Sequence, residues 1–375
     1  MFSRCEAGSS RLDAAGKAGD DLRTSKIDGG VDLQIPGRVT VRDLAQAAGV
    51  SLATVDRVLN GRPGVRPATI AKVEAAIARL GFRRDLTASM LARARDIGLA
   101  VIIPEGSNQF MNRLAEAAQA VGQQVRGERL RLDLLRIRAL DPGALAGALD
   151  GLSPDIHDCA AIIAIDMAEV HAAVERAIGR GIRIITLVSD LPHSARHGFV
   201  GIDNVAAGRT AASLMGRFCR MGKVGLVAGS LDLRDHAERI AGFRAVADAE
   251  YPRLEIVGPV EGQDAFTATY EKTLALLRTH PGLMGVYNVG AGNAGMLTAL
   301  AEMGMNHTVA VIAHELTGPT RAGLASGAVD AVIDQGPEAE IRAVCAMARR
   351  LVLGADAAPP ERPLEIRIFL RDNLP

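Results

Sequence analysis

The chain has 375 residues, 48% of them hydrophobic, and its 43 basic side chains balance 43 acidic ones. A chain of that length can bury one or two large hydrophobic cores and form a small extra domain besides. The balanced charge argues against a protein whose whole surface binds nucleic acid. The four scattered cysteines favour a reducing compartment, and the absence of an apolar run of about 18 residues or of a hydrophobic signal core predicts a cytoplasmic protein that is neither exported nor membrane-spanning.

Residues 1–38 are rich in Gly, Ser and Asp and carry no sustained hydrophobic periodicity. Such a composition cannot bury enough apolar surface to fold by itself. We therefore expect a disordered N-terminal extension over these residues.

Residues 39–60 predict two short helices that are joined by a tight turn. Gly49 supplies the conformational freedom for the turn, and Ser51 is placed to cap the second helix. The apolar residues of the first helix recur at helical spacing, at Val41, Leu44, Ala45 and Ala48. The buried stripe of the second helix is expected to comprise Leu52, Val55, Val58 and Leu59. This pattern is typical of a helix-turn-helix, whose second helix enters the major groove of DNA.

A third helix is expected from Arg66 to about Leu80, where Gly81 ends it. With the first two helices it makes a compact DNA-binding domain over residues 39–84. Residues 85–96 follow as a short hinge helix or linker, which is too short to be stable alone.

Positive charge is concentrated in this part of the chain. Four acids, Asp43, Asp56, Glu74 and Asp85, lie between Val39 and Arg95. The same stretch holds ten basic residues, which are Arg42, Arg57, Arg62, Arg66, Lys72, Arg79, Arg83, Arg84, Arg93 and Arg95. Phosphate groups of DNA would pair with this excess, although a solvated charged face is the alternative interpretation.

From Ile97 onward, apolar runs such as IGLAVII, CAAIIAI and KVGLVAG alternate with amphipathic helical segments. Such alternation predicts parallel sheets flanked by helices. The remaining stretch of about 280 residues is too long for one doubly wound sheet, and a break after Asp203 predicts two similar lobes with a cleft between them. Ligands in such folds bind at the carboxyl ends of the strands.

Two motifs could indicate other chemistry. Gly290, Gly292 and Gly295 fit the G-x-G-x-x-G pattern of an NAD-dependent oxidoreductase, but they lie late in their domain, whereas that fingerprint normally opens it. Asp190, His193 and His197 offer metal-ligand side chains, but Pro192 favours a solvated loop. Because no nucleophile and base occur at recognisable spacing, we expect no enzyme, no cofactor and no metal.

The run from Thr40 to Gly61, TVRDLAQAAGVSLATVDRVLNG, resembles the DNA-binding motif of the lactose repressor/galactose repressor (LacI/GalR) family of bacterial transcription regulators. The resemblance extends over residues 39–375. It implies a small all-α helix-turn-helix headpiece, a hinge, and an α/β two-lobed effector and dimerisation domain over residues 97–375. That domain is expected to be similar to type I periplasmic sugar-binding proteins.

The resemblance also implies roles for headpiece residues. Leu52, Ala53 and Arg57 fall on base-reading positions, where Arg57 can pair with a guanine and the two apolar residues can contact a thymine methyl. Asp56 departs from the family, which commonly has Ser at this position. It could orient Arg57, accept from a cytosine amino group, or be a plain surface acid. Phosphate contacts are implied for Thr40, Ser51, Thr54 and Asn60.

Leu91 falls on the hinge leucine that members of this family insert into the minor groove. The alternative is that Leu91 packs on the lobe below it. Ser89 stands where the family often has Arg, so this hinge lacks one positive charge.

Polar residues at the ends of predicted strands are expected to hold a small sugar or polyol, because each hydroxyl both donates and accepts. By resemblance Arg239 holds ligand hydroxyls, and Glu315 stands where relatives usually have Asp. The sequence has no Trp and three Tyr, which weakens the case for a pocket that stacks on a pyranose ring. The predicted effector-binding residues are Asn108, Gln109, Phe110, Asp190, Arg239, Asn288, Glu315 and Gln335.

These features predict a ligand-responsive transcription regulator. More specifically, we expect a repressor of genes for the uptake or catabolism of a carbohydrate or polyol. It would bind a pseudo-palindromic, double-stranded operator as a homodimer. No heptad helix follows the Pro-rich segment after Gly354, so a tetramer is not expected. The alternatives are a solute-binding protein, which would need a signal peptide, and an oxidoreductase, which would need a cofactor pocket around the GAGNAG loop.

Overall fold

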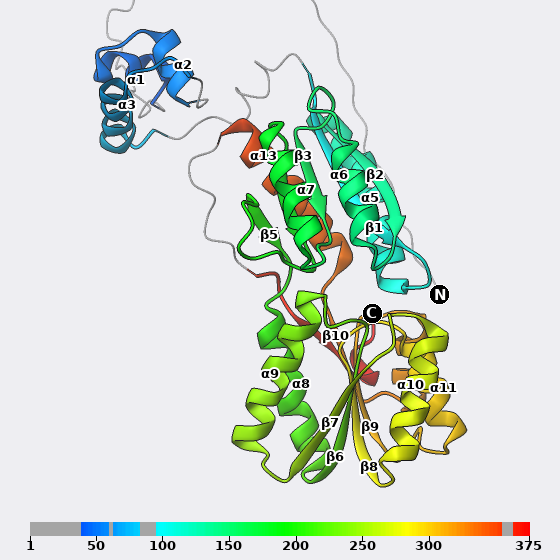
Figure 1. The fold of residues 1–375 in the computed structure, drawn as a ribbon. Coiled ribbons are helices and arrows are strands. Elements are labelled where there is room, and N and C mark those ends of the chain that lie inside the picture. Colours follow the sequence, from blue (N-terminus) through cyan, green and yellow to red (C-terminus); the bar gives the residue numbers. More distant parts are fainter. Residues whose placement is uncertain (1–38, 60–62, 83–94, 355–362) are drawn as a thin grey trace, which may run out of the picture.

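The computed structural model describes residues 39–59, 63–82, 95–354 and 363–375 (Figure 1). The predicted extension over residues 1–38, Asn60, the hinge leucine Leu91 and most of the predicted hinge 85–96 lie outside the described residues. Within the described ranges, every helix is too short or too polar to cross a lipid bilayer.

The N-terminal unit consists of helices α1 (Val41–Ala48), α2 (Leu52–Leu59) and α3 (Pro67–Leu80). Gly49 ends α1 with φ of 65°, and the Ser51 hydroxyl oxygen accepts from the Thr54 amide at 3.2 Å, which confirms the predicted turn and cap. Buried residues from all three helices, together with Phe82 just after α3, form its core, namely Leu44, Ala45, Val55, Val73, Ala76 and Phe82. The prediction that Leu52 is buried was wrong, since the core contact of α2 is made by Val55 and Leu52 is 47% exposed.

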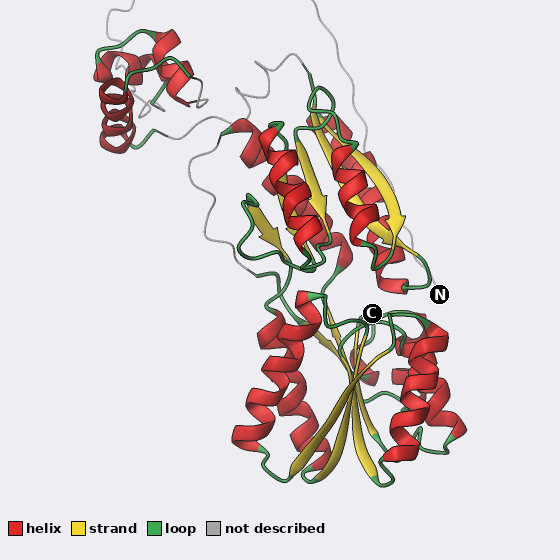
Figure 2. Ribbon diagram, in the orientation of Figure 1, coloured by secondary structure: helices red, strands yellow, loops and turns green. Residues whose placement is uncertain are grey.

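The larger unit contains two sheets, each between two layers of helices (Figures 1 and 2). In the first lobe, defined here as residues 95–202 and 337–354, all strands are parallel in the order β2-β1-β3-β4-β5. The strands are β1 (Ile97–Glu105), β2 (Leu130–Arg138), β3 (Cys159–Ile162), β4 (Arg183–Leu187) and β5 (Gly198–Val200). Helices α5 (Gln109–Val125) and α13 (Pro337–Leu353) cover one face, and α6 (Pro142–Asp150) and α7 (Ala168–Gly179) cover the other.

The second lobe, residues 203–336 and 363–375, has the strand order β11-β10-β9-β8-β6-β7, in which only β11 is antiparallel to its neighbour. Its strands are β6 (Gly222–Ala228), β7 (Leu254–Glu261), β8 (Leu283–Asn288), β9 (Ala310–His314), β10 (Ala331–Asp334) and β11 (Arg367–Phe369). Its helices are α8 (Asn204–Cys219), α9 (Arg234–Glu250), α10 (Phe266–Thr279), α11 (Asn293–Glu302) and α12 (Gly318–Ser326). Short 3-10 helices lie at Arg126–Glu128 in the first lobe and at Arg371–Asn373 in the second. The chain passes from the first sheet to the second lobe at the predicted break, because β5 ends at Val200 and Asp203 caps α8, which leads into the second sheet.

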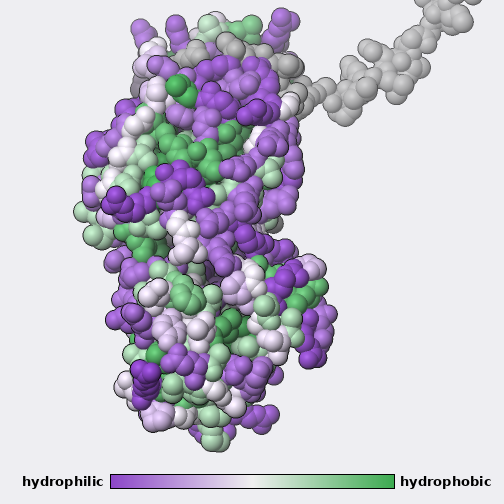
Figure 3. Space-filling model, turned by 90° about the vertical axis from the view of Figure 1, so that its right-hand side faces the viewer, coloured by the Kyte–Doolittle hydropathy of each residue, from purple (hydrophilic) through white to green (hydrophobic). Residues whose placement is uncertain are grey.

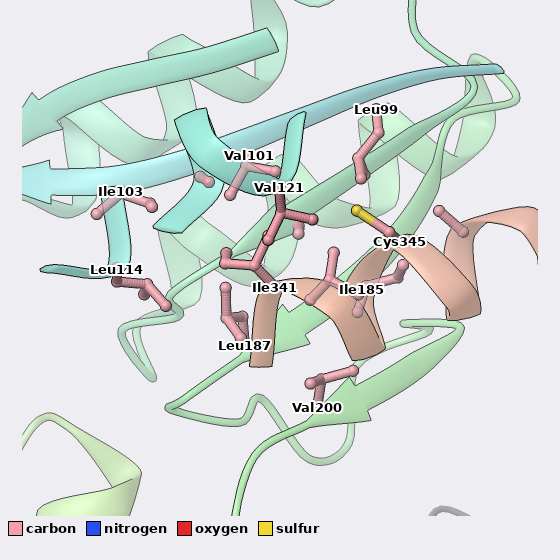
Figure 4. Close-up of a cluster of buried hydrophobic side chains, with 14 of the residues drawn as sticks. Leu99, Val101, Ile103, Leu114, Val121, Ile185, Leu187, Val200, Ile341 and Cys345 are labelled. Carbon is pink, nitrogen blue, oxygen red and sulfur yellow. The ribbon is translucent and has the colours of Figure 1, made fainter. Parts of the chain in front are cut away.

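The two lobes are interleaved in sequence. After β10 the chain returns to the first lobe as α13, and residues 363–375 then lie on the second lobe, where β11 pairs with β10. Ile341 and Cys345 of α13 pack among Val121 of α5 and Ile185 of β4 (Figure 4). Hydrophilic residues predominate on the face of the molecule shown in Figure 3, with apolar residues in smaller groups between them.

Helices α8 and α9 lie side by side (Figure 1), and glycines stand where their backbones meet. A Cβ atom at Gly208 would lie 1.9 Å from the backbone oxygen of Arg239, and one at Gly242 would lie 2.1 Å from that of Val205. Only glycine lets the two helix backbones approach so closely. This contact fixes the part of α9 from which Arg239 projects.

Candidate functional site

The outer face of α2 is the first candidate surface. Leu52, Ala53, Asp56 and Arg57 are all exposed, while Val55 on the opposite side is fully buried. Packing of Val55 in the core therefore fixes the orientation of α2. The exposed face of the helix then carries two apolar side chains, one carboxylate and one guanidinium. These groups are of the kinds that contact base edges in a major groove.

The hydroxyls of the predicted phosphate-binding residues also have local roles. Thr40 caps α1, because its hydroxyl oxygen accepts from the Asp43 amide at 3.3 Å. In return, its hydroxyl and backbone amide both donate to the Asp43 carboxylate at 2.7 Å. Ser51 and Thr54 share a hydrogen bond of 2.9 Å at the start of α2. Both of these arrangements pre-order a helix N-terminus, which is itself suited to an anion such as phosphate.

The second candidate is a cavity between the two lobes. The first lobe contributes Asn108, Phe110 and Met111 from the start of α5, with Ile163 and Val188 from strand ends. The second lobe contributes more of the polar lining, namely Asp235, His236, Arg239, Asp264, Glu315 and Gln335. The cavity thus lies where the carboxyl ends of the strands of both sheets meet, as expected for this architecture.

Arg239 is the buried cation of this cavity, with 2% of its side chain exposed. Its Nε donates to Asn204 Oδ1 at 2.9 Å, and its Nη1 donates to the backbone oxygen of Val289 at 2.7 Å. Its Nη2 lies 3.7 Å from Asp235 Oδ2 and has no hydrogen-bond partner among the described residues. Two fixed bonds therefore hold the guanidinium and leave one edge for a ligand.

Glu315 and Gln335 are two further polar residues of the lining. Gln335 Nε2 donates to Glu315 Oε1 at 2.6 Å, and both residues are almost fully buried. Glu315 follows β9 with φ of 70°, a backbone conformation that is uncommon for a residue with a side chain. Burial, and then the nearby Asp334 carboxylate, raise the pKa of Glu315 to about 8. Burial also raises the pKa of the neighbouring Glu340 well above its ordinary range.

Asn108 connects the two lobes. Its Oδ1 caps α5 by accepting from the amides of Phe110 and Met111 at 3.0 and 3.1 Å. Its Nδ2 donates across the cleft to Asp264 Oδ2 at 3.2 Å, and Asp264 Oδ1 accepts from the Ala291 amide at 2.8 Å. The residue predicted to bind ligand is therefore also a contact between the lobes.

The cavity does not include every predicted effector-binding residue. Asp190 instead pairs with Arg196, whose Nη2 donates to it at 2.7 Å, and accepts from the Thr186 hydroxyl. Asn288 donates to the Ala291 carbonyl oxygen at 3.0 Å and so holds the loop after β8. Gln109 is exposed and lines a neighbouring cavity with Phe266 and Pro319. The structure brings together Asn108, Phe110, Arg239, Glu315 and Gln335.

Three titratable residues of the lining were not predicted from the sequence, namely Asp235, His236 and Asp264. Asp264 follows β7 in the same way that the predicted residues follow their strands, so the end of that strand was the available signal. Asp235 lies one helical turn before Arg239 on α9, a spacing that places an acid beside a base.

The glycines of the GAGNAG loop have a packing explanation. A Cβ atom at Gly292 would lie 2.1 Å from the Thr269 hydroxyl, and one at Gly295 would lie 2.2 Å from the Phe266 backbone oxygen. The loop therefore needs glycine to pack against α10, which weakens the dinucleotide interpretation. His197 of the proposed metal group accepts from the Ile184 amide at 3.1 Å, and the described residues contain no cluster of three or more potential metal ligands.

Raising the pH from about 6 to about 8 is expected to destabilise the two-lobed domain. The pKa of Glu315 is raised to about 8 in the folded protein, against an ordinary value of 4.5. Between these values the folded protein holds a proton that the unfolded chain has released. The stabilisation is therefore complete below pH 4.5 and is lost as the pH rises through 8. Urea unfolding followed by circular dichroism should show a loss of about 2 to 3 kcal/mol over this range.

The variant Glu315→Gln should flatten this pH dependence, and part of the slope should persist because Glu340 is also buried. The exposed Glu338→Gln, on the same helix as Glu340, is the control and should keep the full slope. An identical slope in wild type and Glu315→Gln would contradict the assignment. The charged and polar groups near Glu315 are Arg239, Asp334, Gln335 and Glu340.

The sequence matches two known families and several curated proteins. The family described as bacterial regulatory proteins, lacI family, matches residues 40–85, and the periplasmic binding protein domain matches residues 97–356. Catabolite control protein A of Priestia megaterium is 45% identical over 83 residues, which are 22% of this chain and 25% of that protein. The HTH-type transcriptional regulator GalS of Salmonella typhimurium is 40% identical over 86 residues, 23% of this chain and 25% of that protein. The chain spans about a quarter of the length of these relatives.

Solved structures share the two-lobed fold. A solute binding protein of an ABC transporter from Burkholderia graminis, in complex with D-arabinose, has a TM-score of 0.69 at 24% identity and covers 75% of this chain and 97% of that one. GanP, a glucose-galactose binding protein from Geobacillus stearothermophilus, has a TM-score of 0.69 at 19% identity and covers 75% of this chain and 99% of that one. At these identities the likeness establishes the fold alone.

Proposed function

This chain belongs to the lacI family of bacterial regulatory proteins, and on that premise we propose that it is a transcription regulator that binds operator DNA under the control of a small hydrophilic ligand. One observation carries the proposal, namely that a single chain has both the exposed face of α2 and a polar cavity between two lobes. A repressor of genes for carbohydrate or polyol uptake or catabolism, acting in the cytoplasm, is the specific form that we propose.

Recognition of DNA would begin with α2 in the major groove. Arg57 can donate two hydrogen bonds to a guanine, and Leu52 and Ala53 can contact a thymine methyl group. We propose that two copies of the chain bind as a homodimer, because a two-fold symmetric protein matches a pseudo-palindromic operator.

Control by the ligand would act through the contacts between the lobes. Besides the bond between Asn108 and Asp264, Arg113 of α5 donates to the Leu316 carbonyl oxygen at 2.5 Å, and the Arg234 amide donates to the Ser189 hydroxyl at 3.1 Å. A ligand held by both lobes favours the arrangement in which these contacts form. A coupling free energy of about 1 to 3 kcal/mol between ligand and DNA is typical of such switches.

The variant Arg57→Ala is expected to reduce sequence selectivity by about 10- to 100-fold, which corresponds to the loss of one bidentate contact to a base. An operator would first be selected by the wild-type protein from a random duplex library. Fluorescence anisotropy would then compare that duplex with a scrambled one at two salt concentrations, with and without candidate sugars and polyols.

The control for this experiment is Arg42→Ala, because Arg42 is an exposed cation on α1 and its loss removes the same charge. It should weaken binding to both duplexes about equally, since contacts to phosphate carry no sequence information. Equal affinity of the wild-type protein for selected and scrambled duplexes would refute the proposed function.

A further inference from the structure

We infer that the effector carries a protonated amine beside its hydroxyl groups, as an amino sugar or an aminocyclitol does, and that Asp235 and Glu315 recognise this amine. The inference rests on the proposed function and concerns the same cavity. It depends on which buried polar atoms of the cavity have partners, and on the sign of the charge around them.

The first observation is an excess of hydrogen-bond acceptors. Three oxygen atoms of the lining have no hydrogen-bond partner among the described residues, namely Asp235 Oδ1, Glu315 Oε2 and Gln335 Oε1. Each belongs to a residue that is at least 96% buried, since the exposed fractions are 4%, 4% and 2%. Leaving such atoms unpaired is costly, so a ligand that fits the cavity should supply donors.

Among the hydrogen-bond donors of the lining, one buried atom has no partner among the described residues. This atom is Arg239 Nη2, and its nearest acid atom, Asp235 Oδ2, lies 3.7 Å away. An ammonium group offers three donors and no acceptor, which matches the three oxygens. A hydroxyl oxygen on the same molecule would accept from Arg239.

The second observation is the charge of the surroundings. The cavity is lined by the acids Asp235, Asp264 and Glu315, against the one guanidinium of Arg239. His236 Nε2 lies 3.7 Å from Asp235 Oδ2, and the imidazole Nδ1 is already engaged with the Ser230 backbone at 3.1 Å. The buried acids Asp334 and Glu340 also lie near Glu315, although Asp334 is paired with Arg367 and lies 3.8 Å from Arg113.

A cation therefore relieves repulsion that a neutral polyol would leave in place. The raised pKa of Glu315 has the same origin, because burial and a neighbouring carboxylate both disfavour its charged form. An ammonium beside it would favour the carboxylate and form a charge-assisted hydrogen bond.

The test uses the full chain and pairs of compounds that differ only in one amino or hydroxyl group. Isothermal titration calorimetry at a pH slightly below neutral would compare D-glucosamine with D-glucose, D-galactosamine with D-galactose, D-mannosamine with D-mannose, and scyllo-inosamine with scyllo-inositol. We expect at least one amine to bind about tenfold or more tightly than its hydroxyl partner, which is the change that one hydrogen bond to a charged group produces. If every amine binds no more tightly than its partner, or no amine binds, the inference is wrong.

Two isosteric variants test the residues that would recognise the amine. Asp235→Asn removes a carboxylate, and Glu315→Gln removes the carboxyl group that a bound ammonium would hold in its charged form. Both variants keep the shape of the side chain, so each should reduce the ratio of hydroxyl to amine dissociation constants by about tenfold. The control is Asp190→Asn, which removes an acid that pairs with Arg196 and does not line the cavity, and it should leave the ratio unchanged. If these residues had a purely structural role, each variant would bind the amine and its hydroxyl partner more weakly to the same extent. An unchanged ratio of the two dissociation constants in both variants would therefore overturn the assignment of these residues.

The same samples separate this inference from the proposed function. Selective binding of a DNA duplex without any preference for an amine would overturn the inference alone. Absence of selective DNA binding would overturn the proposed function, whatever the cavity binds.

Discussion

Replacement of Arg239 by methionine is expected to abolish the ligand response and to destabilise the two-lobed domain by about 3 to 5 kcal/mol. The side chain is 2% exposed, and its removal leaves Asn204 Oδ1 and the Val289 carbonyl oxygen without their donor and the buried Asp235 without its neighbouring cation. Urea unfolding would measure the loss of stability, and calorimetry would measure the loss of ligand binding.

A second variant keeps this prediction testable if the methionine protein does not fold. Arg239→Lys retains the positive charge. However, a lysine ammonium lacks the planar set of donors with which the guanidinium bonds to both Asn204 and Val289. The variant should fold and bind ligand at least tenfold more weakly, while its DNA affinity in the absence of ligand stays that of the wild type. The control is Arg244→Met on the same helix, where one hydrogen bond to the Gly258 carbonyl oxygen is lost. If Arg239→Lys keeps the full ligand affinity, then Arg239 has no role in binding.

The variant Leu44→Ala is expected to unfold the headpiece and so abolish DNA binding. Leu44 is fully buried, and truncating a buried leucine costs about 2 to 5 kcal/mol. A core as small as that of residues 39–82 rarely supplies more than about 3 to 5 kcal/mol in total. Anisotropy should show no binding to the selected duplex, while calorimetry should show an unchanged affinity for the effector.

Leu52→Ala is the matched control, because Leu52 is 47% exposed on the same three-helix unit. It should change the stability of the headpiece by no more than about 0.5 kcal/mol. Any loss of DNA affinity in this variant would then come from the contact surface itself. Retention of tight DNA binding by Leu44→Ala would contradict the role of this core.

Periodicity predicted the headpiece well, and its one error has a physical reason. A helix of two turns such as α2 has few positions, and both Leu52 and Val55 fit an apolar stripe equally well. Only the packing against α1 and α3 selects Val55 for the core. The alternation of apolar runs and amphipathic segments likewise predicted the sheets, because parallel strands buried on both faces need continuous apolar sequences.

The cavity was predicted only in part. Arg239 was predicted because its motif resembles that of a known family, and Glu315 and Gln335 were predicted because they are polar residues at the ends of predicted strands. Asp190 fits the same reasoning, but Arg196 neutralises it, after a loop in which His193 has φ of 68° and redirects the chain. Such a contact is set by loop geometry, which no spacing in the sequence reveals. Asp264 was not predicted, although it lines the cavity. Its partner across the cleft, Asn108, lies far away in sequence, so no local pattern connects the two residues.

The interleaving of the two lobes has a consequence for synthesis on the ribosome. Residues 39–82 pack among themselves and emerge early, so the headpiece can fold while most of the chain is still untranslated. The first lobe lacks one covering helix until α13 has been made, and the edge of the second sheet stays open until β11 arrives. A nascent chain would therefore complete the three-helix unit before either lobe, and premature termination before α13 would leave that folded unit joined to an incomplete first lobe.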